Sequence, residues 1–462
     1  MEASAMAERL TPLDLLMPRT YIGAAFLFRT TELNATMSKR LQSALDDLCE
    51  QLPWLNGRIL PVSRDREASK SGKVPGLEIR WDETASAPKI IDKGFIKRSY
   101  DTLAEENMPA AAIPADVWPV SNMIDDALFA AGAPVLGASL FRFSDGQGIG
   151  LCICLHHNAV DAAGFAEVVR LWVRNMKGAK PLLLSSGSGR FERLCRGLSS
   201  HLVSLKEPSF SALIALHPEH SREPPQLPSE FAPCTAKLFR LPMAQIDTVK
   251  TRLRDCMHAP PTTNTLVCAL IWSSVTRARK ERSPETVHQP SRLAMAVNGR
   301  RRISAAFSPT EDPYYGNTIV YSLAEIASRD LMETANIRSL ARICDIIAQS
   351  QSGARIDDRH IAEVCSLVDE VDDYRTLFPG WDLFNSRDLT ITSWADLDLY
   401  ALDFGIGLGK PEFVRMPYVE ADGVGIIMPR RRVADEILEV VIMLRRDDMD
   451  FLELYNVWEC LT

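Results

Sequence analysis

A histidine pair between a predicted hairpin and a predicted helix constrains this chain more than any other feature. Leu136–Phe143 and Ile149–Leu155 have the composition of two strands, and the residues between them contain Asp-Gly, which favours a hairpin turn. The second strand runs directly into the segment His156-His157-Asn158-Ala159-Val160-Asp161, and the apolar spacing after it predicts a helix. A histidine and a carboxylate four residues later are therefore expected at a strand-to-helix junction, where we expect chemistry.

The composition limits the kinds of partner. With 462 residues the chain exceeds the usual size of a single core, so two domains are expected. The net charge of -8 does not favour a nucleic-acid partner. No apolar run approaches about 18 residues, so no membrane span is expected, and the first residues lack the pattern of a secretory signal. The ten cysteines contain no C-x-x-C pair, which favours a reducing compartment and predicts a cytoplasmic protein.

Strand and helix patterns alternate along the chain, which predicts the α/β (α+β) class. We expect an N-terminal domain over residues 1–181, a crossover connection over 182–234 where the periodicity fades, and a C-terminal domain over 235–462. Two local predictions are an irregular surface segment over Asp101–Trp118 and a short helix over Ala324–Ser328.

Several short motifs, spread in order over nearly the whole length, resemble those of the BAHD-type acyltransferases, a coenzyme-A-dependent family marked by His-x-x-x-Asp. The resemblance is to the fungal branch that acts on secondary metabolites, with trichothecene-O-acetyltransferase-like features. The matching pieces are Leu10-Thr11-Pro12-Leu13-Asp14, His157-x-x-x-Asp161, Thr262-Thr263-Asn264 with Ala269-Leu270-Ile271-Trp272, Asn298-x-Arg300-x-Arg302, Tyr315-Gly316-Asn317, Thr392-Ser393-Trp394 and Asp403-Phe404-Gly405-Ile406-Gly407 with Lys410-Pro411.

The resemblance implies a fold and an activity. Two chloramphenicol-acetyltransferase-like domains, each a sheet covered by helices, would enclose a channel between them. The implied reaction moves an acyl group, most simply acetyl, from coenzyme A to a hydroxyl of a small hydrophobic terpenoid or polyketide. It would proceed in a ternary complex without a covalent acyl-enzyme. Acyl-CoA would be a co-substrate, no cofactor would be permanently bound, and the protein would be a monomer.

Histidine suits the general base of such a reaction, because its ordinary pKa leaves the neutral imidazole available near neutral pH. We assign this role to His157 and a structural or orienting role to His156. Asp161 is either the orienter of a hydrolase-like triad or, as the resemblance implies, a structural residue paired with an arginine. Arg300 is the expected arginine, with Asp161 or Asp403 as its partner, so all three residues are predicted to support the site.

Further residues have two interpretations each. By resemblance, Thr392 and Trp394 line the acyl group and donate to the oxyanion, although both also suit a strand. Thr262, Thr263 and Lys410 are candidates for binding coenzyme A, although a helix cap and a solvated charge explain them equally well. Gly405 is expected to allow a tight turn after Asp403 that helps form the coenzyme channel.

Two positions depart from the family pattern: Ala162 replaces the usual glycine after the motif aspartate, with a glycine at Gly164, and Ile406 replaces a tryptophan. The first departure suggests that the turn after Asp161 is permitted to vary. The segment His217-Pro218-Glu219-His220 has metal-ligand residue types, but we expect a solvated loop and no metal.

Two other functions remain open from the residues. A condensation-type enzyme that takes its donor from a carrier protein shares the histidine motif, and a non-catalytic descendant would bind a ligand only. The acceptor, the acyl chain length, and O- against N-transfer have no readable code in the sequence.

Overall fold

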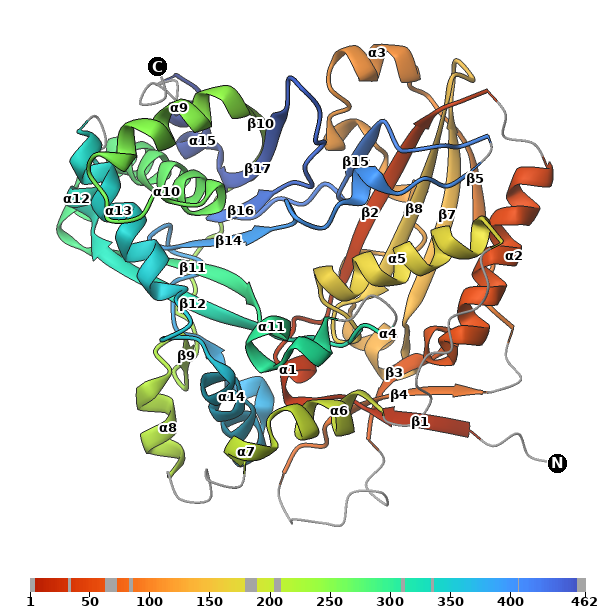
Figure 1. Cartoon of the computed structure of the whole chain (residues 1–462), viewed down its shortest axis with the longest axis horizontal. Coiled ribbons are helices and arrows are strands. Elements are labelled where there is room, and N and C mark those ends of the chain that lie inside the picture. The colour runs from red at the N-terminus through yellow and green to blue at the C-terminus, as the bar shows by residue number, and fades with distance from the viewer. Residues whose placement is uncertain are drawn as a thin grey trace.

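Two large sheets organise the structure, each covered by helices (Figure 1). The computed structural model describes residues 5–31, 35–62, 73–82, 86–178, 189–202, 209–308, 312–333, 336–405 and 407–454. The strand order is β15-β2-β8-β7-β5 in the first large sheet and β10-β17-β16-β14-β11-β12 in the second. The predicted mixture of strands and helices in two covered sheets is confirmed.

The first sheet is buried on both faces, which explains the continuous apolar run of its central strand. Its strands are β2 (Tyr21–Arg29), β5 (Ile91–Ile96), β7 (Leu136–Phe143), β8 (Gly148–His156) and β15 (Phe413–Arg415). Side chains alternate across β8, so that Ile149, Leu151 and Ile153 join one core cluster and Cys152 and Cys154 join another. The helices α2 (Ala35–Gln51) and α5 (Ala162–Met176) pack on the first of these faces and contact each other.

The opposite face of the first sheet is covered by a segment for which the sequence predicted irregular surface structure. That prediction is wrong for much of Asp101–Trp118. Helix α3 (Tyr100–Glu105) and short 3-10 turns occur here. Buried apolar side chains in this segment, with Tyr100 just before it, pack on the sheet and include Leu103, Met108, Ile113, Val117 and Trp118.

The second sheet contains β10 (Cys234–Pro242), β11 (Pro290–Asn298), β12 (Ile319–Ala327), β14 (Leu389–Ser393), β16 (Val424–Ile427) and β17 (Ile437–Arg445). Its helices are α9 (Met243–Arg254), α10 (Thr263–Arg282), α12 (Ser328–Leu331), α13 (Ile337–Ser350) and α15 (Arg446–Leu454). The helix predicted over Ala324–Ser328 is wrong, because β12 pairs with β11 up to Ala327. Its buried residues recur at every second position, which is a strand period.

Smaller elements fill the region below the two large sheets in Figure 1. A four-stranded sheet has the order β1-β4-β3-β6, and a two-stranded ribbon joins β9 to β13. These strands are β1 (Ala5–Arg9), β3 (Arg58–Pro61), β4 (Leu77–Asp82), β6 (Ala133–Pro134), β9 (His220–Ser221) and β13 (Phe378–Pro379). The helices are α1 (Pro12–Leu15), α4 (Asp126–Ala131), α6 (Arg190–Gly197), α7 (Ser199–Leu202), α8 (Phe210–Leu216), α11 (Arg300–Ile303) and α14 (Asp358–Glu370). A core formed by α1, α6, α11 and α14 joins segments from both halves of the chain.

The later part of the chain returns to the first sheet. Strand β15 pairs antiparallel with β2, and Trp394, Leu402 and Phe404 belong to the core cluster of the first sheet. The described residues of 394–405 and 407–415 therefore pack with the N-terminal part although the predicted C-terminal domain includes them. The division into 1–181, 182–234 and 235–462 stays a prediction, and its first boundary lies outside the described residues. Within the described residues, no helix is both long enough and apolar enough to cross a membrane.

Candidate active site

His157 lies where the first sheet ends against the start of α5. It directly follows β8, and its backbone N–H donates to the carbonyl oxygen of Thr20 at 2.8 Å. The backbone N–H groups of Ala159 and Val160 donate to the carbonyl oxygen of His156 at 2.8 and 3.3 Å, so the chain turns tightly before the helix begins. The turn leaves His157 partly exposed, whereas His156 is fully buried.

The backbone holds the imidazole of His157 in one tautomer. Its Nδ1 lies 3.2 Å from the carbonyl oxygen of Val160. Because a carbonyl oxygen only accepts, Nδ1 carries the proton in this contact and Nε2 keeps its lone pair. Burial lowers the pKa of His157, which favours the neutral ring near neutral pH. This is the form that a general base requires.

Asp161 forms a buried ion pair with Arg300. Nη1 and Nη2 of Arg300 donate to the two carboxylate oxygens at 2.8 and 2.9 Å. The same carboxylate accepts from the backbone N–H of Gly164 at 2.8 Å, as the N-cap of α5, and from that of Thr318 at 3.0 Å. The sequence left open whether Asp161 or Asp403 pairs with Arg300, and the partner in the structure is Asp161. The geometry therefore matches the arginine-paired aspartate rather than a triad orienter.

The guanidinium of Arg300 has partners on every side. Nε donates to the carbonyl oxygen of Tyr314 at 3.0 Å, and Nη2 donates to that of Gly316 at 2.8 Å. Nη1 also donates to Oγ1 of Thr318 at 3.0 Å. A buried charge needs such hydrogen bonds in addition to its counter-ion to offset its desolvation. The pair thus fixes the start of α5 against the segment 314–318 from the later part of the chain.

Asn317 links the backbone of His157 to a buried carboxylate, and sequence reasoning missed this link. Its Nδ2 donates to the carbonyl oxygen of His157 at 2.9 Å and to Oδ1 of Asp14 at 2.8 Å. Asn158 in turn donates through Nδ2 to the carbonyl oxygens of Asp14 and Met17 at 2.7 and 2.9 Å. The motifs that contain Asp14 and Asn317 match the family, but the sequence assigned no role to either residue. The signal that could have found them is a polar side chain inside a short, mostly apolar motif.

Arg190 was also missed, because it lies in the connection that the sequence predicted to be irregular. Its side chain is buried, and Nη1 donates to the carbonyl oxygen of Ala159 in the turn after His157 at 2.5 Å. Its Nε lies 3.1 Å from Oε2 of Glu8. The guanidinium carbon also stacks 4.8 Å from the ring centre of Trp54. The connection therefore supports the histidine turn.

Asp403 is placed in a partly exposed turn. It accepts from the Nζ of Lys177 and from the backbone N–H of Gly405, both at 3.0 Å. That N–H and the ammonium group lower the pKa of Asp403. Gly405 has φ of +84°, which an L side chain rarely adopts, and Phe404 packs between two phenylalanines of β2. These contacts agree with a structural turn.

The predicted acyl-lining residues lie at the end of β14. Thr392 is half-buried, and Trp394 is buried with its ring 5.6 Å from that of Phe165 in α5. Trp394 thus comes from the second sheet and packs on the helix that begins after Asp161. Oxyanion stabilisation by these two side chains stays a prediction.

The predicted coenzyme-binding residues lie in two places. Thr262 is the N-cap of α10, and its Oγ1 accepts from the backbone N–H of Thr265 at 3.0 Å. Oγ1 of Thr263 lies 3.4 Å from Nζ of Lys250 at the same helix start. Lys410 is exposed and follows the turn that contains Gly405. A role for these residues toward coenzyme A stays a prediction.

Comparison with known proteins decides the family. Residues 119–455 match the Transferase family over most of the chain. The chain belongs to the Transferase family. The BAHD-type resemblance predicted from the motifs is thereby confirmed, and the curated relatives confirm the predicted class of acyl-CoA-dependent O-acyltransferase.

Curated relatives cover nearly the whole chain at low identity. Trichothecene 8-O-acetyltransferase of Fusarium sporotrichioides is 26% identical over 95% of this chain and 94% of its own length. O-acetyltransferase ptmV of Penicillium ochrochloron is 25% identical over 97% of this chain and 95% of its own length. Fumigaclavine B O-acetyltransferase easN of Aspergillus fumigatus is 25% identical over 91% of this chain and 89% of its own length.

Solved structures share the fold. TRI101 of F. graminearum, in complex with coenzyme A and T-2 mycotoxin, superposes with a TM-score of 0.79 at 18% identity over 97% of each chain. Vinorine synthase superposes with a TM-score of 0.64 at 16% identity, covering 99% of this chain and 95% of its own.

The turn after Asp161 is closely packed at Gly164. Gly164 lies in the first turn of α5 against the backbone of Tyr315, and a Cβ at this position would lie 2.1 Å from the Tyr315 carbonyl oxygen. The glycine therefore permits the close approach of the two halves next to the ion pair of Asp161. The idea that this turn is free to vary is wrong at Gly164. Ile406 lies outside the described residues.

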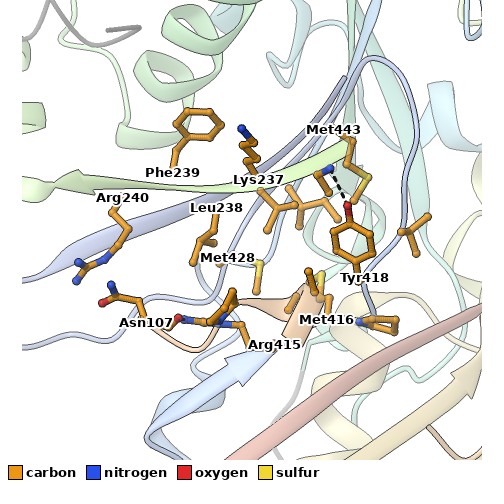
Figure 2. Close-up of a pocket in the computed structure, with 18 of the residues that line it drawn as sticks. Asn107, Lys237, Leu238, Phe239, Arg240, Arg415, Met416, Tyr418, Met428 and Met443 are labelled. Carbon is orange, nitrogen blue, oxygen red and sulfur yellow. Dashed lines mark hydrogen bonds between the residues drawn. The ribbon is translucent and has the colours of Figure 1, made fainter. Parts of the chain in front are cut away.

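A cavity of about 560 Å³ lies between the second sheet and the segment after β15 (Figure 2). Its apolar lining includes Leu238, Met416, Met428, Val441 and Met443. Arg415 at its edge is buried and donates to both carboxylate oxygens of Glu439 at 2.8 and 3.0 Å. His157 is not among the residues that line the cavity.

The predicted solvated loop at His217-Pro218-Glu219-His220 is wrong. His217 and Glu219 are 1% and 4% exposed. Two further residues with ligand side chains, His360 and Glu363 of α14, contact them. The physical reason is that α14, far along the chain, packs against α8.

Proposed function

We propose that this protein transfers an acetyl group from acetyl-CoA to a hydroxyl of a small hydrophobic metabolite of the terpenoid or polyketide class, with His157 as the general base. The observation that carries the proposal is the contact of His157 Nδ1 with the carbonyl oxygen of Val160, which leaves the lone pair on Nε2. The relatives support the terpenoid class, since the name of the Fusarium sporotrichioides relative specifies a trichothecene and that of a further relative, from Penicillium rubens, specifies an eremophilane.

The reaction needs one proton acceptor and no protein nucleophile. Acetyl-CoA supplies a thioester, whose carbonyl carbon the acceptor hydroxyl attacks. Nε2 of His157 takes the hydroxyl proton as the C–O bond forms, and the C–S bond breaks. The proton then passes to the sulfur, so that an ester and free coenzyme A leave and the imidazole is neutral again. A positioned base of this kind is worth about 10² to 10⁴ in rate.

Negative charge develops on the thioester carbonyl oxygen during attack, and donors for it are part of the proposal. We assign this role to Oγ1 of Thr392 and Nε1 of Trp394, because the end of β14 packs against α5 close to the turn that carries the base. Asp161 and Arg300 act as positioning residues, since their pair fixes the first turn of α5.

The start of α10 and the turn after Phe404 are the proposed sites for coenzyme A. The first turn of α10 offers backbone N–H groups, the hydroxyls of Thr262 and Thr263, and the ammonium of Lys250. This donor set fits a phosphate-bearing ligand, because helix N-termini and cations both favour anions. Lys410 is an exposed cation at the second place.

We assign the acceptor skeleton to the cavity beside β15, and since His157 does not line this cavity, the reacting hydroxyl must extend beyond it to reach Nε2 of His157. Its volume of about 560 Å³ is within the range of about 300–1,000 Å³ typical of small-molecule sites. Its methionine-rich lining suits an irregular apolar skeleton, since methionine adapts its shape readily.

A monomer in the cytoplasm is the proposed state. One chain supplies the base, the ion pair and the candidate oxyanion donors, so the site needs no second copy. The nine cysteines within the described residues are free thiols, which agrees with a reducing compartment.

The test is a mass-spectrometric screen of purified protein with acetyl-CoA, longer acyl-CoAs and a panel of hydroxylated terpenoids and polyketides. We expect a product heavier by one acetyl group, and His157→Ala should lower kcat by about 10² to 10⁴ with an unchanged unfolding midpoint. His258→Ala, which alters an exposed histidine, is the matched control. Acyl transfer by His157→Ala at the wild-type rate would overturn the mechanism, and turnover only with a carrier-bound donor would indicate a condensation-type enzyme.

A further inference from the structure

A cluster of histidines and glutamates joins the crossover connection to α14, outside the site proposed for acyl transfer. His217 directly follows α8, and Glu219 lies between α8 and β9. His360 and Glu363 lie three residues apart on α14, so their side chains project from neighbouring positions of one helix face. His217 and Glu219 are 1% and 4% exposed, and His360 is half-buried, so the cluster lies largely in the interior.

Two imidazoles converge on one carboxylate oxygen. His217 Nδ1 lies 2.9 Å and His360 Nε2 lies 3.2 Å from Oε1 of Glu219. The two rings lie edge to face with their centres 4.7 Å apart. One ligand atom from each of His217, Glu219 and His360 lies within 4.8 Å of the others. Such convergence is what a single metal ion at the centre would require.

The hydrogen bonds that the cluster makes on its own are incomplete. Nε2 of His217 and Nε2 of His360 are buried, and neither has a hydrogen-bond partner among the described residues. Carboxylate oxygens lie 3.3 Å from the first, in Glu363, and 3.2 Å from the second, in Glu219, without hydrogen-bond alignment. An unsatisfied buried polar group costs about 1–3 kcal/mol, so the unpartnered Nε2 of His360 requires an explanation such as an ion.

We propose that His217, Glu219 and His360 bind a divalent transition-metal cation, with Zn²⁺ as the best match. Imidazole nitrogen and carboxylate oxygen are ordinary zinc ligands. Nδ1 of His217, Nε2 of His360 and the Glu219 carboxylate face the ion, and a water completes the set. Glu363 then accepts from the Nε2–H of His217, because histidines that bind metal commonly donate their other N–H to a carboxylate.

The site has a structural role. The ion ties the connection between the two large sheets to α14, and α14 contacts α1 and α11. Helix α1 contains Asp14 and α11 begins at Arg300, so the metal fixes a helix that supports the histidine turn. Metal binding and acyl transfer are separate claims, because neither the proposed base nor its substrates take part in the metal site.

Metal content tests the proposal on the full chain, with any polyhistidine tag removed because such a tag would itself bind zinc. Inductively coupled plasma mass spectrometry of the purified protein should find about one zinc per chain. After removal by a chelator, ZnCl₂ should bind again with one-to-one stoichiometry by calorimetry, and CoCl₂ should give the visible absorption of a cobalt ion with nitrogen and oxygen ligands. Added Zn²⁺ should raise the unfolding midpoint.

Variants separate this site from adventitious binding. His217→Ala and His360→Ala should lose the bound zinc and the stabilisation by added Zn²⁺, whereas His258→Ala, at an exposed histidine, should retain both. If an alanine variant fails to fold, the isosteric Glu219→Gln removes a ligand, and Glu363→Gln should weaken binding about 10- to 100-fold. Absence of one-to-one binding to the wild-type chain would overturn the proposal, as would binding that is unchanged in these variants.

Discussion

Arg300 donates to both carboxylate oxygens of Asp161 at 2.8 and 2.9 Å, and both side chains are buried. The two residues are separated by 139 positions and belong to different halves of the structure. The pair therefore joins the start of α5, directly after the candidate base, to the segment that carries Asn317.

Breaking the pair should destabilise the protein strongly. Arg300→Ala leaves the Asp161 carboxylate buried without its counter-ion, which typically costs about 3–5 kcal/mol in the free energy of unfolding. Arg432→Ala is the matched control, because Arg432 is 49% exposed and its pairs with Asp396 and Asp398 lie at the surface. It should cost less than about 1 kcal/mol. Urea denaturation measures both, and equal losses would contradict the role of the buried pair.

Gly164→Ala should also destabilise the junction. The new Cβ would lie 2.1 Å from the carbonyl oxygen of Tyr315, and a backbone oxygen cannot rotate away. We expect a loss of about 1–3 kcal/mol, typical of overpacking, and a lower kcat because the start of α5 moves. Ala162→Gly is the control two residues earlier, and should cost no more than about 1 kcal/mol. A stable, fully active Gly164→Ala would show that the two halves tolerate a wider separation here.

The sequence predicted the local elements and a candidate base at the strand-to-helix junction because these depend on short-range patterns. Alternation and turn residues predict the hairpin of β7 and β8, and apolar spacing predicts the helix after Asp161. The structure contains both strands and the helix. The family motifs added the identity of the enzyme class. Neither kind of pattern specifies which distant residues meet, so the choice between Asp161 and Asp403 as the partner of Arg300 needed the structure.

The errors share a cause, which is tertiary packing that overrides local composition. Polar and proline-rich stretches predicted as surface were buried by distant elements, as for the segment after Tyr100 and for His217. Arg190 lay in such a stretch and was assigned no role, although its guanidinium is buried against the histidine turn. The short helix predicted over Ala324–Ser328 failed because β11 offers a full-length partner strand.

The pH dependence of catalysis should show a single acid limb from His157. Only the neutral imidazole accepts a proton, so kcat/KM falls as the pH drops through the pKa of His157 and is constant above it. Burial lowers that pKa, so the midpoint should lie below the ordinary value of about 6.5. Rates of coenzyme A release from pH 5 to 8 measure the profile. A midpoint above 7 would mean that the protonated ring is stabilised and would contradict the direction of the shift.

Filling the cavity beside β15 should weaken binding of the acceptor and leave binding of the acetyl donor unchanged. Met416 lines the cavity and is half-buried, so Met416→Trp adds volume where the acceptor skeleton is proposed to lie. We expect KM for the acceptor to rise about tenfold or more, which corresponds to about 1.4 kcal/mol of lost binding, while KM for acetyl-CoA is unchanged.

Met123→Trp is the control, since Met123 is 65% exposed and does not line the cavity. Steady-state kinetics with each substrate varied in turn separates the outcomes. A rise in KM for acetyl-CoA alone would assign the cavity to the donor, and unchanged constants for both substrates would exclude it from the substrate path.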